Sequence, residues 1–226
     1  MKERRKGSSA DSGHEGGAGR FRRIVEARLP TEFGNFSVIA YEDTGSGSEH
    51  LAIVRGDVEG GKNVLVRVHS ECLTGDALGS RRCDCGEQLR TSMRMLGRRR
   101  KGVLLYLRQE GRGIGLMNKM IAYHIQDQGA DTVEANLLLG FEPDERSYDA
   151  AAYILKDLGI LSVVLLTNNP DKIESLRSLG VRVSGRVPLI VGVNRSNIRY
   201  IVTKKRKLNH MIDENQLLKD VKKRSA

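Results

Sequence analysis

The chain has no tryptophan, and its aromatic residues amount to only 4% of 226 positions. Proteins that bind single-stranded nucleic acids usually stack bases on aromatic side chains, so this composition is poor material for such a surface. No segment approaches the roughly 18 consecutive apolar residues of a transmembrane helix. The basic start at residues 1–9 has no apolar stretch behind it. We therefore expect neither a secretory signal nor a membrane partner.

Cysteine is also scarce, because the chain has only three, with the spacing Cys72-x10-Cys83-x-Cys85. An odd number of thiols cannot pair completely in disulfides, and the polar, turn-forming residues 81–86 are unlike the surroundings of a cysteine in a core. Thiolates suit Zn²⁺, and a site with three protein ligands leaves a position open for water or substrate. The pattern favours a catalytic zinc site, with His69 as a possible fourth ligand. Thiols placed for a metal indicate a reducing, cytoplasmic location.

Positive charge is concentrated at the two ends of the chain, although the formal net charge is +10. Residues 1–23 contain seven Lys and Arg against three acidic residues, and residues 204–226 contain eight against three. Residues 24–203 are nearly neutral, with 23 basic and 22 acidic side chains. A zinc-stabilised nucleic-acid-binding module would explain the basic ends but neither the neutral body nor the missing fourth ligand. We therefore expect no nucleic-acid partner.

The hydrophobic pattern indicates one long folded region between two polar ends. Residues 1–20 are rich in Gly, Ser and charge, which predicts a flexible basic extension, and residues 213–226 are interpreted as a basic tail. Strand-like segments dominate the first third of the folded region, and strands then alternate with helices. This order predicts an α/β fold, in which a mixed, partly parallel sheet with a β-rich N-terminal portion is covered by helices. The expected strands are 24–29, 36–41, 51–55, 64–69, 102–107, 163–166, 181–183 and 187–193, and the expected helices are 87–96, 116–128, 147–158 and 170–180.

Two loops have features of anion-binding sites. The segment 109–115 has three alternating glycines between a predicted strand and a predicted helix, which is a geometry that can bring backbone amides to a phosphate. By itself the signal is weak, because it matches neither the Walker A nor the dinucleotide-binding pattern. The segment 167–172 opens a helix with Asn169 and Pro170 at its start and offers a hydroxyl, free amides and Lys172. It is a second candidate anion site.

The segment around the cysteines closely resembles one enzyme family, GTP cyclohydrolase II. The resemblance is carried by Arg67-Val68-His69-Ser70-Glu71-Cys72-Leu73-Thr74-Gly75-Asp76, by Arg82-Cys83-Asp84-Cys85-Gly86 and by Gln109-Glu110-Gly111-Arg112. It covers roughly Arg23 to Ile212, so residues 21–212 are expected to form one catalytic domain. The chain has no room for the dihydroxybutanone phosphate synthase half that some members carry, which implies a monofunctional enzyme.

The resemblance implies a reaction at the start of riboflavin biosynthesis. In this family, zinc-dependent hydrolysis of GTP opens the imidazole ring at C8 and releases formate and pyrophosphate. The product is 2,5-diamino-6-(5-phosphoribosylamino)pyrimidin-4(3H)-one. The resemblance implies Cys72, Cys83 and Cys85 as the zinc ligands, Mg²⁺ on the triphosphate, and a homodimer. A relative that opens the ring without releasing formate is the alternative within the enzyme class, and Tyr123 argues against it.

Catalytic and nucleotide-binding residues also follow from the resemblance. Tyr123 matches the active-site tyrosine, Asp144 a proton acceptor and Arg146 a nucleophile, although an arginine that only stabilises the charge of the α-phosphate would occupy the same position. Gln88 and Glu110 suit the guanine edge, and the cationic and hydroxyl side chains suit phosphate oxygens. The full set of expected GTP contacts is Arg67, Val68, His69, Ser70, Glu71, Gln88, Glu110, Gly111, Arg112, Thr132, Thr167 and Lys172.

Overall fold

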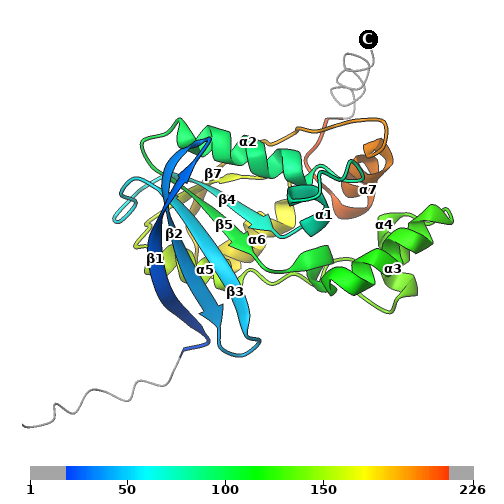
Figure 1. The fold of residues 1–226 in the computed structure, drawn as a ribbon, viewed down its shortest axis with the longest axis horizontal. Coiled ribbons are helices and arrows are strands. Elements are labelled where there is room, and N and C mark those ends of the chain that lie inside the picture. Colours follow the sequence, from blue (N-terminus) through cyan, green and yellow to red (C-terminus); the bar gives the residue numbers. More distant parts are fainter. Residues whose placement is uncertain (1–18, 214–226) are drawn as a thin grey trace, which may run out of the picture.

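We describe a computed structural model of the chain, which covers residues 19–213. In this part of the chain, one seven-stranded sheet has the order β1-β2-β3-β5-β4-β6-β7 (Figure 1). The strands are β1 (Phe21–Thr31), β2 (Gly34–Asp43), β3 (Ser48–Arg55), β4 (Val64–Ser70), β5 (Gly102–Leu107), β6 (Val163–Leu166) and β7 (Val183–Val187). The helices are α1 (Leu73–Asp76), α2 (Cys85–Gly97), the 3-10 helix η1 (Glu110–Gly113), α3 (Gly115–Asp127), α4 (Thr132–Leu138), α5 (Asp149–Asp157), α6 (Pro170–Ser178) and α7 (Ile198–Leu208).

The sheet is mixed, as the sequence predicted. The strands β1, β2, β3 and β5 pair antiparallel, whereas β5, β4, β6 and β7 pair parallel. The α/β class and the β-rich N-terminal portion are therefore confirmed. The predicted extension 1–20 and tail 213–226 lie outside the described residues except for Gly19, Arg20 and Asp213.

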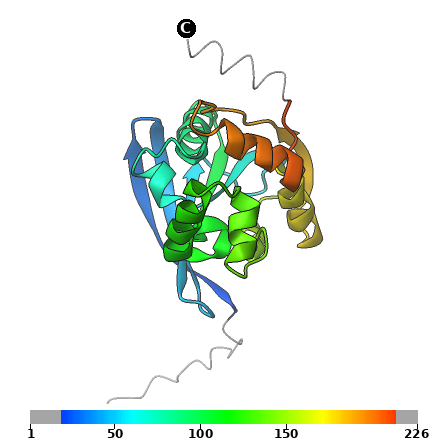
Figure 2. The ribbon, with the colours of Figure 1, turned by 90° about the vertical axis from the view of Figure 1, so that its right-hand side faces the viewer.

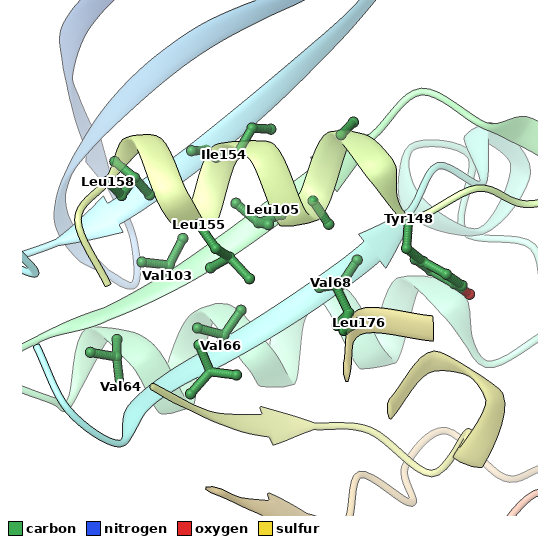
Figure 3. Close-up of a cluster of buried hydrophobic side chains, with 14 of the residues drawn as sticks. Val64, Val66, Val68, Val103, Leu105, Tyr148, Ile154, Leu155, Leu158 and Leu176 are labelled. Atoms are coloured by element: carbon green, nitrogen blue, oxygen red, sulfur yellow. The ribbon is translucent and has the colours of Figure 1, made fainter. Parts of the chain in front are cut away.

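Helices cover both faces of the parallel part of the sheet, which explains why β4 and β5 read as nearly continuous apolar runs. On one face, α5 and α6 pack on Val66, Val68 and Leu105, with Ile154 and Leu176 as their buried contacts (Figure 3). On the other face, α2 buries Met93 and Leu96 against Leu65 and Leu104. Residues 67 and 69 of β4 belong to this second face, so Arg67 and His69 lie on the side of α2.

The remaining helices gather at the carboxyl ends of the parallel strands. There α1 and η1 follow β4 and β5, and α3, α4 and α7 surround the same end of the sheet (Figures 1 and 2). In open α/β sheets ligands bind in the crevice outside these strand ends. No helix among residues 19–213 combines the length and apolar character needed to cross a membrane.

The last two predicted strands are wrong. β7 lies between them at Val183–Val187 and includes only one residue of each of the segments 181–183 and 187–193, and no regular structure follows it until α7. Pro188 comes next and has no backbone N–H for a ladder. The side chain of Asn168 replaces the missing strand partner, since its Nδ2 donates to the Leu189 carbonyl at 2.6 Å and its Oδ1 accepts from the Leu189 N–H at 2.9 Å.

Candidate active site

The three thiols converge beyond the carboxyl end of β4. Cys72 follows β4 after one residue, and Cys83 and Cys85 lie at the start of α2. Their sulfur atoms all lie within 4.8 Å of one another, and the Sγ atoms of Cys72 and Cys83 are 3.6 Å apart. All three cysteines are free, and Cys72 and Cys83 are buried. Three sulfur donors at this spacing suit Zn²⁺.

Two glycines allow this convergence. A Cβ atom on Gly75 would lie 2.9 Å from the Cys83 sulfur and 3.2 Å from the Cys72 sulfur. A Cβ atom on Gly86 would lie 2.1 Å from the Gly75 carbonyl oxygen. The backbone of α1 therefore touches the first turn of α2, and the thiols occupy the space that a side chain at position 75 would need.

A buried lysine lies beside the thiols. Lys119 Nζ in α3 donates to Cys72 Sγ at 3.2 Å, to Thr74 Oγ1 at 3.0 Å and to Glu110 Oε1 at 2.7 Å. Hydrogen bonds from Cys83 and Cys85 lower the pKa of Cys72, and the charge of Lys119 lowers it further, although burial opposes both effects. The site therefore favours a thiolate at Cys72, which is the form that binds metal.

His69 is engaged away from the thiol cluster. Its Nε2 lies 3.1 Å from both carboxylate oxygens of Asp76. Asp76 Oδ2 also accepts from the Cys72 backbone N–H and from the Tyr106 hydroxyl, each at 3.0 Å. Burial lowers the pKa of His69, so the neutral imidazole donates its Nε2 proton to Asp76. This arrangement holds the loop at Cys72 in place and leaves the three sulfurs as the donor set.

Tyr123 lies one helical turn beyond Lys119 on the same face of α3. Its hydroxyl is 3.4 Å from Thr74 Oγ1, and the guanidinium of Arg82 lies 4.8 Å from its ring centroid. Burial raises the pKa of Tyr123 to about 12. Near neutral pH the phenol keeps its proton and can act as a hydrogen-bond donor or an acid.

Two buried cations, Arg67 of β4 and Lys172 of α6, also line the cavity. The Arg67 guanidinium donates to the Leu166 carbonyl at 3.0 Å and to Gln88 Oε1 at 2.6 Å. Its Nε atom is buried without a hydrogen-bond partner among the described residues. Lys172 Nζ in α6 donates to the Val68 carbonyl at 2.7 Å. Burial lowers the pKa of both groups, so both would gain from a nearby anion.

The loop after β5 presents Arg112 from a strained backbone. Arg112 has a φ of 64°, in the left-handed region that non-glycine residues rarely adopt. Its backbone carbonyl accepts from the Glu145 N–H at 3.0 Å, and a Cβ on Gly113 would lie 2.9 Å from the Glu145 carbonyl oxygen. Strain of this kind collects at ligand-binding sites, and here the close contact with residue 145 maintains it.

Asp144 and Arg146 form a partly buried ion pair. Asp144 Oδ1 accepts from Arg146 Nε at 2.7 Å and from the Arg146 backbone N–H at 3.2 Å. Burial acts to raise the pKa of Asp144, but its bonds to Arg146 outweigh that effect and lower it. The pKa of Arg146 is raised because Tyr148 and Asp144 outweigh its burial. Both side chains are therefore charged at neutral pH.

Most of the predicted site residues line one cavity. Val68 and Asp144 do not. Val68 packs in the core (Figure 3), and Asp144 is paired with Arg146, which does line the cavity. Val68 offers the site only its carbonyl. The predicted residues that line the cavity are Arg67, His69, Ser70, Glu71, Cys72, Cys83, Cys85, Gln88, Glu110, Gly111, Arg112, Tyr123, Thr132, Arg146, Thr167 and Lys172.

The structure adds residues to this region that the sequence reading did not select. Lys119, Asp84, Tyr200, Lys204 and His210 line the same cavity. A signal existed for Lys119, since it precedes Tyr123 by four positions in a predicted helix and shares its face. Asp84 lies inside the quoted motif between Cys83 and Cys85, whereas Tyr200, Lys204 and His210 reach the cavity only through contacts between distant segments.

The chain is similar to known proteins over most of its length. The family model described as GTP cyclohydrolase II matches residues 22–188. A protein named GTP cyclohydrolase-2 from Actinobacillus succinogenes is 54% identical over 87% of this chain and 90% of its own length. A protein of the same name from Proteus mirabilis is 55% identical over 85% of this chain and 97% of its own length. The riboflavin biosynthesis protein RibBA of Endomicrobium trichonymphae is 51% identical over 84% of this chain, but only 47% of its own length is covered.

Proposed function

This chain belongs to the GTP cyclohydrolase II family of hydrolases, and on that premise we propose that it opens the imidazole ring of GTP at C8. The proposed reaction releases formate and pyrophosphate and leaves 2,5-diamino-6-(5-phosphoribosylamino)pyrimidin-4(3H)-one, as the first step of riboflavin biosynthesis. The observation that carries the proposal is that three thiols and a group of buried cations line one cavity at the carboxyl ends of the parallel strands.

Cys72, Cys83 and Cys85 would hold the zinc ion. When bound there, the ion would supply the Lewis acidity that makes water a nucleophile near neutral pH. Three thiolates and one Zn²⁺ carry a formal charge of −1, which opposes that effect. Lys119, with its ammonium 3.2 Å from the Cys72 sulfur, offsets part of this negative charge. We assign Lys119 to this supporting role.

The guanine end of the substrate is assigned to Gln88 and Glu110. Glu110 Oε2 accepts from the Leu73 N–H at 2.6 Å, and Oε1 accepts from the Gly111 N–H at 2.8 Å and from Lys119. These bonds fix the carboxylate and leave about one of its four acceptor positions for the base. Tyr123 keeps its proton near neutral pH and is assigned as the donor to the opening ring.

The triphosphate is assigned to the cations Arg67, Arg112, Lys172 and Arg146, with the hydroxyl of Thr167. Arg67 and Lys172 are buried and hydrogen-bonded to neutral groups, so a phosphate would supply the anion they lack. Mg²⁺ on the triphosphate, a homodimeric assembly and a cytoplasmic location complete the proposal, on the basis of the family.

For Arg146 we favour electrostatic stabilisation of the α-phosphate over nucleophilic attack. Its guanidinium stays protonated, because Asp144 and Tyr148 raise its pKa, and a protonated guanidinium is a poor nucleophile. Asp144 then orients Arg146 through the two bonds described above. Trapping during turnover with a labelled nucleotide distinguishes the two roles, since attachment of the label to the protein would establish the covalent one.

The test of the function is to incubate the purified, zinc-loaded protein with GTP and Mg²⁺ and to measure formate, pyrophosphate and the diaminopyrimidine. We expect all three in equal amounts and no activity from Cys83→Ser. Ring opening without formate would support the alternative relative. Full activity in the Cys83→Ser protein would rule out the proposed metal site.

A further inference from the structure

The last helix of the described chain is built into the site, although the family model ends at residue 188, before this helix. Asn197, just before α7, is fully buried and donates through Nδ2 to the Cys83 carbonyl at 3.2 Å and to the Gly192 carbonyl at 2.8 Å. After α7, the Met211 N–H donates to the Asn168 carbonyl at 2.9 Å. The helix is therefore attached at both ends to loops that line the cavity.

Lys204 connects α7 to the segment that carries Cys83 and Cys85. Its Nζ donates to Asp84 Oδ1 at 2.6 Å, and the two side chains are only 11% and 8% exposed. Asp84 stands between Cys83 and Cys85 in the sequence. Burying an ion pair costs several kcal/mol per ion in desolvation before the mutual attraction is counted. An apolar residue would cover this surface at lower cost, so the charge of Lys204 requires a further explanation.

The other oxygen of Asp84 continues the network. Asp84 Oδ2 accepts from Gln88 Nε2 at 2.6 Å, and Gln88 Oε1 accepts from Arg67 at 2.6 Å. An ionised carboxylate can only accept hydrogen bonds, so the Gln88 amide must turn its NH₂ group toward Asp84. The amide oxygen then points to Arg67. Lys204 holds the Asp84 side chain through Oδ1, and Oδ2 of the same carboxylate then fixes which way the Gln88 amide lies.

We propose that Lys204 is a positioning residue that acts through Asp84 to hold the turn between Cys83 and Cys85 and to orient the Gln88 amide. Its first effect is on how firmly the thiols hold a metal ion, and its second is on the recognition of guanine. The second effect rests on the proposed function, whereas the first can be measured without any substrate.

The test compares Lys204→Met with Lys207→Met in the full-length protein. Lys207 lies one turn further along α7 and is exposed. It pairs with Asp131 and Glu134 at the start of α4 and not with Asp84. Each protein is loaded with Zn²⁺ or Co²⁺, and the transfer of Zn²⁺ to a chelator and the visible absorption of the Co²⁺ form are recorded. We expect Lys204→Met to weaken zinc retention about 10–100-fold, as loss of an outer-shell partner does, and to shift the Co²⁺ bands. Lys207→Met should match the wild type within about two-fold.

Two further variants complete the test. Lys204→Arg keeps the charge and should recover most of the zinc retention, and Asp84→Asn should reproduce the defect of Lys204→Met and add little to it in the double variant. Equal zinc retention and Co²⁺ spectra in Lys204→Met and Lys207→Met would overturn the proposal. If Lys204→Met does not fold, wild-type zinc retention in Asp84→Asn would overturn it.

Activity is measured separately, so that the two proposals fail in different ways. With GTP as substrate and with saturating zinc, Lys204→Met should still have a lower kcat/KM than the wild type. Loss of zinc would not account for that decrease. A wild-type protein that does not consume GTP would refute the proposed function, while the zinc and cobalt measurements would still decide the role of Lys204.

Discussion

Alanine at position 75 would test whether the thiols occupy the space that the structure assigns to them. The new Cβ would lie 2.9 Å from Cys83 Sγ, 3.2 Å from Cys72 Sγ and 3.2 Å from Cys85 Cβ. Overpacking a dense site costs about 1–3 kcal/mol. The higher helix propensity of alanine returns about 0.5–1 kcal/mol of this in α1. We therefore expect Gly75→Ala to lower the stability of the metal-free protein by about 0–2.5 kcal/mol.

The zinc-loaded form should lose more, because the thiols can move away from the new methyl group only when no metal holds them together. Thermal unfolding of zinc-loaded and chelator-treated protein measures both effects, with about 2–4 °C expected per kcal/mol in a domain of this size. Zinc content per chain should also fall. Gly185→Ala is the matched control, since its Cβ would meet only Val164 at an ordinary 3.8 Å. Unchanged zinc content and unfolding temperature in Gly75→Ala would refute the arrangement of the thiols.

Three further predictions concern single side chains. Tyr123→Phe keeps the ring beside Arg82 but removes the proton donor, so kcat should fall about 100-fold or more with GTP affinity unchanged, and a fall in affinity alone would contradict the assignment. Burial lowers the pKa of His210 to about 3. Below pH ~6.5 the unfolded chain therefore binds a proton at this histidine that the folded chain does not, so the metal-free wild type loses stability as the pH falls. Between pH 6.5 and 5, urea titrations should show about 1–2 kcal/mol less loss of stability in His210→Gln than in the wild type. An identical pH dependence in both proteins would exclude a neutral His210. Lys172→Met should stabilise the ligand-free protein yet abolish the rise in unfolding temperature caused by pyrophosphate, and an undiminished rise would place the phosphates elsewhere.

Much of the site could be predicted because its loops follow strands that are easy to recognise. The apolar runs that end near residues 69, 107 and 166 are parallel neighbours, so the polar residues after them must meet at one edge of the sheet. The thiol spacing and the quoted sequence motifs then predict the candidate metal ligands and the candidate nucleotide contacts. Local sequence and strand order therefore determine where these side chains lie.

The contribution of α7 was harder to predict, because residues 204–207 read Lys-Lys-Arg-Lys and are chemically alike. Only helical spacing distinguishes them, since Lys204 shares a face with the buried Ile201 and lies one turn before Leu208, which lines the cavity. The carboxylate that Lys204 meets is 120 residues earlier in the chain. Local periodicity does not indicate a contact between residues so far apart in the sequence. The strand wrongly predicted at 187–193 also hid the irregular segment that leads to α7.

The buried cations of the cavity fall into two groups, which differ in whether a carboxylate lies within hydrogen-bond distance. Lys119 and Lys204 each have a carboxylate within hydrogen-bond distance, Glu110 and Asp84, and both lie beside the thiol loop. There they can offset thiolate charge without themselves requiring a ligand. Arg67 and Lys172 instead donate to neutral acceptors, and burial lowers the pKa of both. An uncompensated buried charge destabilises the fold unless an anion arrives. Under the proposed function, a triphosphate would supply the anionic partner that Arg67 and Lys172 lack. Lys119 and Lys204 already have carboxylate partners and lie beside the proposed metal ligands.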